Sequence, residues 1–350
     1  MGHQYSAVLW NRQKKIYDLV LLAGVIVYLL VFIVVSQFLR PEITEETLII
    51  RATGSLALLM LHIILAIGPL SRLNNRFLPL LYNRRHLGVS MFVIAAVHGV
   101  FSILQFHSLG NANPLVSVFS SNLQYNSLQE FPFQTLGFFA LIIFFMMAAT
   151  SHDFWLANLG PKFWKTMHML VYVAYGLIIM HVMLGIVQSE PSVLLVTLLG
   201  AGFLLIAGLH LLAGFRESKS DVEKSPNQRG YILIGQVSEI PENAAVTVVT
   251  NGEKVAIFKY DGKVSAVSNV CKHQNGPLGE GKIIDGCITC PWHGYQYLPH
   301  DGCSPPPFTE KVATYDIILE GEKVYLNPKP YPEGTEGKPA IIKSTLNQDI

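Results

Sequence analysis

The sequence predicts a two-part protein, in which an all-α bundle of six transmembrane helices is followed by a small all-β domain. Only 14% of the 350 residues are charged and 51% are hydrophobic, whereas about 25% of a soluble protein is charged. The apolar residues are concentrated in residues 1–215, and short β-rich runs begin at residue 230. We therefore expect a membrane protein with a soluble domain attached.

Six apolar runs support the helical part. They lie at about 16–39, 48–70, 87–107, 131–151, 164–187 and 191–214. Each has about the 20 residues that an α-helix needs to cross a lipid bilayer. The first run, Ile16 to Leu39, is longer than the core of a signal peptide. Residues 1–215 are thus predicted to form a multi-pass bundle in the bilayer.

Lysine and arginine predict the orientation of this bundle, because they accumulate in cytoplasmic loops. The residues before the first run, the second and fourth loops and the residues after the last run carry them, whereas the third loop (108–130) has none. Both termini and the β domain are expected in the cytoplasm, with the bundle in a bacterial inner membrane. The net charge is +1 and no basic arm is present, so nucleic acid is not an expected partner.

The rest of the chain divides into three segments. Residues 216–229 are charged and contain serine, which predicts a linker. Residues 230–327 hold β-rich runs separated by turns such as Asn251-Gly252 and Asp261-Gly262. Residues 328–350 are rich in proline, glycine and lysine and are expected to be a flexible tail.

Two cysteine–histidine motifs in the β domain predict a metal centre. Cys271 and His273 are followed, after sixteen residues, by Cys290 and His293. Two thiolates and two imidazoles suit a Rieske [2Fe–2S] cluster, in which two Cys hold one iron and two His hold the other. The alternative is a structural zinc site, but zinc fingers usually place both Cys on one loop and both His on the other. In this chain, each loop supplies one Cys and one His.

The two remaining cysteines, Cys287 and Cys303, are expected to be buried free thiols. A disulfide between them would need an oxidising compartment, which the predicted cytoplasmic location does not provide.

Histidines inside the apolar runs are candidate haem ligands, because ionisable groups in a membrane are costly and b-type haem needs a pair of axial imidazoles. His98 lies thirteen residues beyond Arg85, and His181 lies sixteen beyond Lys165. At 1.5 Å per residue, both are about 20 Å or more from the inner surface. His98 and His181 are thus predicted to bind one haem on the outer side.

A second, inner haem would use His168, which is only three residues beyond Lys165. Its partner would be His62 or His86. His168 and His181 are thirteen residues apart, about 220° around an ideal helix. Either the fifth span is distorted, or the haems lie on different sides of it, or only one of the two histidines binds haem. Whether the bundle binds one haem or two therefore remains open.

Residues from about 50 to 190 resemble the ferric reductase-like transmembrane domain, the haem-bearing core of ferric reductases, NADPH oxidases and the membrane haem subunit of the bacterial methionine sulfoxide reductase system. The resembling segments are 54–73, 84–103 and 150–185. The resemblance implies that His98, His168 and His181 are haem ligands. Two-haem members carry a second histidine on the third span, about fourteen residues from the first, where this chain has Ala112.

Residues 230–327 resemble the Rieske ferredoxin domain, through the two ligand loops 271–281 and 290–297 and a proline-bearing third loop at 301–308. Quinol-oxidising Rieske proteins carry an extra Cys in each ligand loop, joined by a disulfide. Gly276 and Trp292 stand there in this chain, and Tyr295 replaces their serine. The resemblance implies a ferredoxin-like cluster of lower potential, with Tyr297 as the remaining phenol that could donate a hydrogen bond to sulfur.

These features favour membrane-bound electron transfer from a cytoplasmic donor, through the cluster and b-type haem, to an acceptor on the outer side. Residues 216–350 contain no G-x-G-x-x-G motif, so we expect a separate cytoplasmic reductase to supply the electrons. A quinone-linked membrane oxidoreductase is the alternative. A Rieske oxygenase, which needs a further mononuclear iron, and a purely structural cluster are less favoured. Whether the chain is itself an enzyme is left open.

Overall fold

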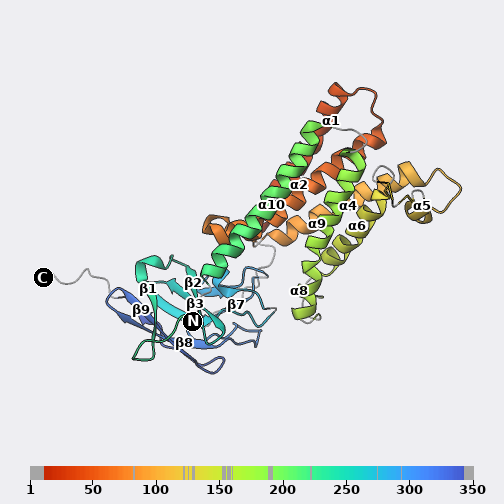
Figure 1. The fold of residues 1–350 in the computed structure, drawn as a ribbon. Helices are drawn as coiled ribbons and strands as arrows, with labels where there is room; N and C mark the ends of the chain where they lie inside the picture. Colours follow the sequence, from red (N-terminus) through yellow and green to blue (C-terminus); the bar gives the residue numbers. More distant parts are fainter. Residues whose placement is uncertain are drawn as a thin grey trace. The chain divides into compact units, whose positions relative to one another are not determined.

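The computed structural model describes most of the chain. The described residues are 12–81, 83–120, 123–124, 126–127, 131–151, 155, 159, 161–187, 192–220, 223–273, 275–292 and 294–342. They form two compact units. One contains the described residues of 12–70 and 83–212, and the other contains those of 71–81 and 213–342. The first unit is helical and the second holds the β domain (Figure 1).

Apolar helices build the helical unit, and each predicted span has a counterpart. The long helices are α1 (Arg12–Leu39), α2 (Glu45–Leu73), α4 (Arg84–His107) and α10 (Val193–Ser220), with α6 (Phe133–Ala149) shorter and α8 (Pro161–Met169) followed by α9 (Val171–Val182). α6 packs against α4 and α9. Their outward side chains are exposed leucine, valine and phenylalanine, as expected of a surface in contact with lipid.

The helical part contains more helices than the six that were predicted. Among the described residues, five helical stretches are long and apolar enough to cross a membrane, with Phe163–Gly185 counted as one, and α6, with 17 residues, is shorter. Two short helices, α3 (Leu78–Leu81) and α5 (Pro114–Ser120), lie in predicted loops. The reason for α5 is local: Asn113 accepts a hydrogen bond from the Leu115 amide at 2.9 Å, and Pro114 occupies the first helical position. Hydropathy does not detect such a signal.

The fifth predicted span is distorted, which was the first of the three alternatives for His168 and His181. A break at Leu170 separates α8 from α9, and a π-helical segment, Met183–Val187, follows α9. The break lies between His168 and His181. The stretch that joins these two histidines is therefore not one regular helix.

Antiparallel strands form the β domain. They are β1 (Ile232–Gln236), β2 (Ala244–Thr250), β3 (Glu253–Tyr260), β4 (Lys263–Ser268), β5 (Lys282–Ile284), β6 (Cys287–Thr289), β7 (Gln296–Tyr297), β8 (Thr314–Glu320), β9 (Lys323–Pro330) and β10 (Ala340–Ile341). The larger sheet has the order β1-β9-β8-β4-β3-β2, with β10 paired to β4, and β5-β6-β7 form a smaller sheet.

The two predicted turns close hairpins of the larger sheet. Asn251-Gly252 joins β2 to β3 and Asp261-Gly262 joins β3 to β4, and all four residues have positive φ between 46° and 72°. Two residues in the left-handed region form a type I′ turn, whose twist matches that of the strands. The alternation of side chains along β3 then sends Val255 and Ile257 into one apolar cluster and Phe258 into another.

The segment boundaries differ from those expected. α10 continues to Ser220, five residues past the predicted end of the bundle, and strand β9 continues to Pro330. Within the expected tail, Ala340 and Ile341 pair with Val264 and Lys263 of β4. β8 pairs with β4 only at Ala266 and Val267, so the start of β4 can accept these two residues on the same side, which composition alone does not reveal. Residues 343–350 lie outside the described residues.

Candidate redox centres

The predicted cluster ligands lie on loops that flank the small sheet. Cys271 follows β4, and Cys290 follows β6 directly. Both thiols are 1% exposed and belong to the same apolar cluster as Phe258, Leu278 and Ile288. A buried thiolate needs compensation, which a bound metal would provide.

The two loops have the same backbone geometry. The carbonyl of each Cys accepts from the amide four residues on, Asn275 at 2.7 Å and Gly294 at 2.9 Å. Each Cys amide donates to the carbonyl five residues on, Gly276 at 2.9 Å and Tyr295 at 2.8 Å. Asn275 and Gly294 both have positive φ, 58° and 73°. The two Cys residues therefore lie in equivalent turns, and in a Rieske cluster two such thiolates hold the same iron.

Gly276 brings the two loops together. A Cβ atom at this position would lie 2.7 Å from Cys290 Sγ and 3.2 Å from the Trp292 ring. Only glycine fits between the loops without displacing the sulfur. This close approach, together with the donor set of two buried thiols and His273, fits a [2Fe–2S] cluster.

His273 is held by aromatic packing. Its ring stacks on Tyr295 with centroids 4.8 Å apart and an interplanar angle of 9°. Tyr295 donates a hydrogen bond to the Glu310 carboxylate and contacts Phe308 of the third loop edge-on at 5.0 Å. By sequence, Tyr295 is only the residue that replaces a serine; its stacking on His273 depends on the fold. His293, the fourth predicted ligand, lies outside the described residues.

Tyr297 is hydrogen-bonded to a predicted cluster ligand. Its hydroxyl lies 3.3 Å from Cys271 Sγ and accepts from the Lys272 amide at 3.0 Å. Burial, and then the neighbouring Cys271, raise the pKa of Tyr297 above its usual range. The phenol therefore remains protonated and is able to donate a hydrogen bond to a thiolate at Cys271.

Replacing Tyr297 with Phe is expected to lower the reduction potential of the cluster by tens of millivolts. A hydrogen bond to sulfur stabilises the reduced, more negative state more than the oxidised one, and 59 mV corresponds to a tenfold change for one electron. Redox titration monitored by EPR measures the shift. Tyr315→Phe serves as the control, because Tyr315 bonds to Glu253 and belongs to the other apolar cluster. An equal potential in both variants would contradict this role.

Cys287 and Cys303 are free cysteines. Burial, with Asp285 nearby, raises the pKa of Cys287 to about 11, so this thiol stays protonated at neutral pH. Cys303 is only partly buried, and its Sγ lies 3.8 Å from the Gly334 carbonyl oxygen.

In the helical unit, the structure brings His98 of α4 and His181 of α9 together. Their ring centroids are 6.2 Å apart and the ring planes are nearly perpendicular, at 87°. Metal–imidazole bonds of about 2 Å on each side would place two axial rings at about this separation. The similar depth of His98 and His181 in the sequence thus predicted that these two histidines lie close together.

Both rings are held through Nδ1 by backbone carbonyls of other helices. His98 Nδ1 lies 2.9 Å from the Ile50 carbonyl oxygen on α2, and His181 Nδ1 lies 2.8 Å from that of Phe133 on α6. A carbonyl can only accept, so Nδ1 carries the proton and Nε2 keeps its lone pair for a metal. The pair therefore has the donor chemistry of a bis-histidine haem site.

His62 and His168 are not brought together in the same way. His62 Nδ1 lies 2.8 Å from the Leu58 carbonyl oxygen, and its Nε2 lies 3.2 Å from the hydroxyl of Tyr175 on α9. His168 Nδ1 lies 3.0 Å from the Trp164 carbonyl oxygen, and its ring stacks on Trp164 with centroids 3.8 Å apart. The Tyr175 hydroxyl is thus hydrogen-bonded to Nε2 of His62, the nitrogen that would have to bind the iron of an inner haem.

His86, the other candidate partner, pairs with Asp18 of α1, with Nδ1 and the carboxylate oxygen 2.7 Å apart. A carboxylate at Nδ1 is also the arrangement found behind metal-binding histidines that coordinate through Nε2. Sequence reasoning missed Asp18 and Tyr175 because these contacts span 68 and 113 residues.

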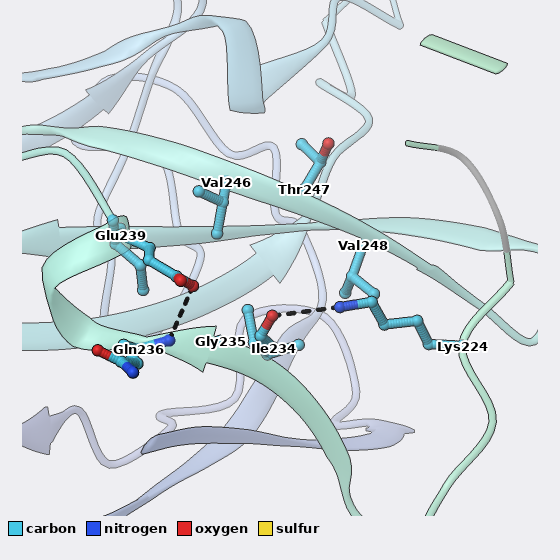
Figure 2. A pocket seen from close by; sticks show the side chains of 9 residues that line it. Lys224, Ile234, Gly235, Gln236, Glu239, Val246, Thr247 and Val248 are labelled. Carbon is cyan, nitrogen blue, oxygen red and sulfur yellow. Dashed lines mark hydrogen bonds between the residues drawn. The ribbon is translucent and has the colours of Figure 1, made fainter. Parts of the chain in front are cut away.

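A small surface pocket on the β domain is separate from both centres. It lies between β1 and β2, beside Lys224 (Figure 2). Lys224 Nζ donates to the Ile234 carbonyl oxygen at 3.2 Å, and the Gln236 amide donates to Glu239 at 3.0 Å. The pocket shares no residue with the cysteine loops, so we assign it no part in the cluster site.

Comparison with protein families and known proteins agrees with these two centres. The Rieske [2Fe-2S] domain matches residues 230–316, and the ferric reductase-like transmembrane component matches residues 51–179. The biphenyl dioxygenase ferredoxin subunit of Pseudomonas sp. (strain KKS102) is 35% identical over 94 residues, which cover 26% of this chain and 85% of the relative.

The helical part is similar to the protein-methionine-sulfoxide reductase heme-binding subunit MsrQ of Ralstonia nicotianae (strain ATCC BAA-1114 / GMI1000). The two are 32% identical over 131 residues, 37% of this chain and about half (55%) of the relative's length. Among solved structures, the ferredoxin of Sphingomonas yanoikuyae B1 matches 29% of this chain and 98% of its own at 25% identity and a TM-score of 0.26.

The fold and the two centres define a multi-pass membrane electron-transfer protein that uses a [2Fe–2S] cluster and b-type haem. The chain combines a ferric reductase-like transmembrane domain with a C-terminal Rieske domain, and through the latter it belongs to the Rieske family.

Proposed function

We propose that this protein carries single electrons from a cytoplasmic donor, through the Rieske cluster and b-type haem, to an acceptor on the outer side of a bacterial inner membrane. The observation that carries the proposal is the His98–His181 pair at 6.2 Å in the helical unit of a chain whose β domain buries Cys271 and Cys290. The cluster and haem supply the redox chemistry, and the protein positions them and tunes their potentials.

Each ligand assignment belongs to this proposal. Cys271, His273, Cys290 and His293 would hold the cluster. His98 and His181 would hold the outer haem through Nε2, because Nδ1 of both rings is bonded to a carbonyl. His168 remains the candidate for an inner haem, whereas the contact of His62 with Tyr175 makes His62 a weaker candidate than the sequence suggested.

The donor is proposed to be a separate cytoplasmic reductase. The chain has no dinucleotide-binding glycine motif between residues 216 and 350. In addition, the similar Pseudomonas protein is named a ferredoxin subunit. The loop charges support a cytoplasmic β domain, with residues 216–229 proposed as the connection to the bundle and 230–327 as the cluster domain.

Sealed vesicles test the direction of transfer. The purified chain is inserted into liposomes that enclose ferricyanide, and photoreduced flavin is added outside as a one-electron donor. Molecules whose β domain faces outward should reduce the enclosed ferricyanide, monitored by its absorbance. Haem-loaded vesicles that perform no better than empty liposomes would refute the transmembrane relay. Transfer that depends on added ubiquinone would favour the quinone-linked alternative.

A further inference from the structure

Two glycines contact the histidines of the proposed outer haem. A Cβ atom at Gly54 of α2 would lie 2.8 Å from His98 Nδ1 and 2.9 Å from its Cε1. A Cβ at Gly137 of α6 would lie at the same two distances from His181. Side-chain carbon atoms do not approach other atoms this closely, so each ring occupies the volume that an alanine methyl group would need.

The same two helices provide the hydrogen bonds. His98 bonds to the carbonyl of Ile50, four residues before Gly54, and His181 bonds to that of Phe133, four residues before Gly137. In an α-helix the Cα–Cβ bond tilts toward the N-terminus, so the side chain at i+4 overhangs the carbonyl at i. A glycine at i+4 therefore leaves this carbonyl open to a ring from a neighbouring helix.

The two sites are equivalent. Each consists of a helix carbonyl, a glycine four residues later and an imidazole delivered by another helix, and they act on two rings that face each other at 6.2 Å and 87°. A hydrogen bond at Nδ1 and a flat glycine surface together restrict both the tilt and the rotation of a ring.

We propose that Gly54 and Gly137 are positioning residues that hold His98 and His181, through the Ile50 and Phe133 carbonyls, with their ring planes perpendicular for axial ligation of one haem. This inference rests on the proposed role of the two histidines as ligands. In addition, the helices α2 and α6, which supply no ligand to this haem, determine the orientation of the His98 and His181 rings.

The unmutated protein provides the first test. In low-spin ferric haem, the angle between the two axial imidazole planes sets the anisotropy of the EPR signal, and perpendicular planes give the most anisotropic one. The purified full-length chain should show this highly anisotropic signal. A rhombic signal, typical of parallel planes, would overturn the inference while leaving the haem relay intact. A chain that binds no haem would instead remove the proposed function itself.

Alanine at either glycine provides the second test. Gly54→Ala and Gly137→Ala should each weaken haem retention about 10- to 100-fold, the usual cost of losing a partner behind a metal ligand, and should change the EPR signal of the haem that remains. The pyridine haemochrome assay gives haem per protein, and the cluster EPR signal shows that the chain is folded.

The chain offers matched controls. A Cβ at Gly88 of α4 or Gly176 of α9 would meet nothing within 4 Å, so alanine there should leave haem binding unchanged. A Cβ at Gly99 would lie 2.8 Å from Leu141 Cδ2, an equally close contact in the same region but against an aliphatic side chain. Gly99→Ala should retain the anisotropic signal. Equal haem loss in Gly99→Ala, or no loss at Gly54 and Gly137, would show that the glycines do not position the histidines.

Discussion

Cys290→Ser is expected to abolish the iron–sulfur cluster and to leave the haem in place. Cys290 is 1% exposed, and the close packing of Gly276 against its Sγ leaves no room for a compensating ligand. Rieske clusters take two cysteine thiolates, and a serine hydroxyl is a poorer ligand for iron–sulfur clusters than a thiolate. The cluster EPR signal should disappear. The rate at which a one-electron donor reduces the haem should fall to the rate at which the donor reacts with the haem directly, without the cluster.

Cys303→Ser is the matched control, because Cys303 lies in the same domain and is not a predicted ligand. Its thiol lies 3.8 Å from the Gly334 carbonyl oxygen and is partly exposed. This variant should keep the cluster signal and the rate of haem reduction. A [2Fe–2S] spectrum in Cys290→Ser, or fast haem reduction without a cluster, would contradict the proposed order of electron transfer.

His98→Ala and His181→Ala should each remove the outer haem. Loss of a ligand should exceed the roughly 10- to 100-fold effect of losing a group behind it. The ring that remains would still be held by its carbonyl but would lack the second axial bond. Haem content by the pyridine haemochrome assay, with the cluster signal as internal standard, measures the loss.

His210→Ala is the matched control for these variants. His210 resembles the predicted ligands in bonding through Nδ1 to a carbonyl, that of Ile206, but its Nε2 lies 3.1 Å from the Tyr172 hydroxyl. It should retain the outer haem, and so should His62→Ala, whose ring has the analogous contact with Tyr175. Retention of full haem content by His98→Ala would exclude His98 as a ligand.

A good part of the architecture follows from local sequence. Hydropathy located the helices because each apolar run must match the bilayer thickness. Asn251-Gly252 and Asp261-Gly262 predicted their hairpins because both positions of these turns need positive φ. The spacing of Cys271, His273, Cys290 and His293 indicated the cluster because one short loop must reach two adjacent irons. Composition did not predict the short helix α5, nor the pairing of residues 340–341 with β4.

The proposed haem site shows where local sequence stops being informative. Counting residues from the charged loops gives the depth of a histidine along its helix. By this measure alone, His98 and His181 lie at similar depths in the membrane. It does not give the direction of the side chain around the helix or the neighbour that it meets. For that reason His62 was a candidate ligand by depth, although its Nε2 contacts Tyr175, 113 residues away.

The sequence by itself therefore determined the two classes of cofactor, the apolar spans and the residue types that could act as ligands, because these depend on local spacing and composition. Only the tertiary structure decided which histidines face each other, and that Gly54 and Gly137 leave the Ile50 and Phe133 carbonyls open to them. Such contacts join helices that are far apart in the chain, so they exist only once the helices have packed.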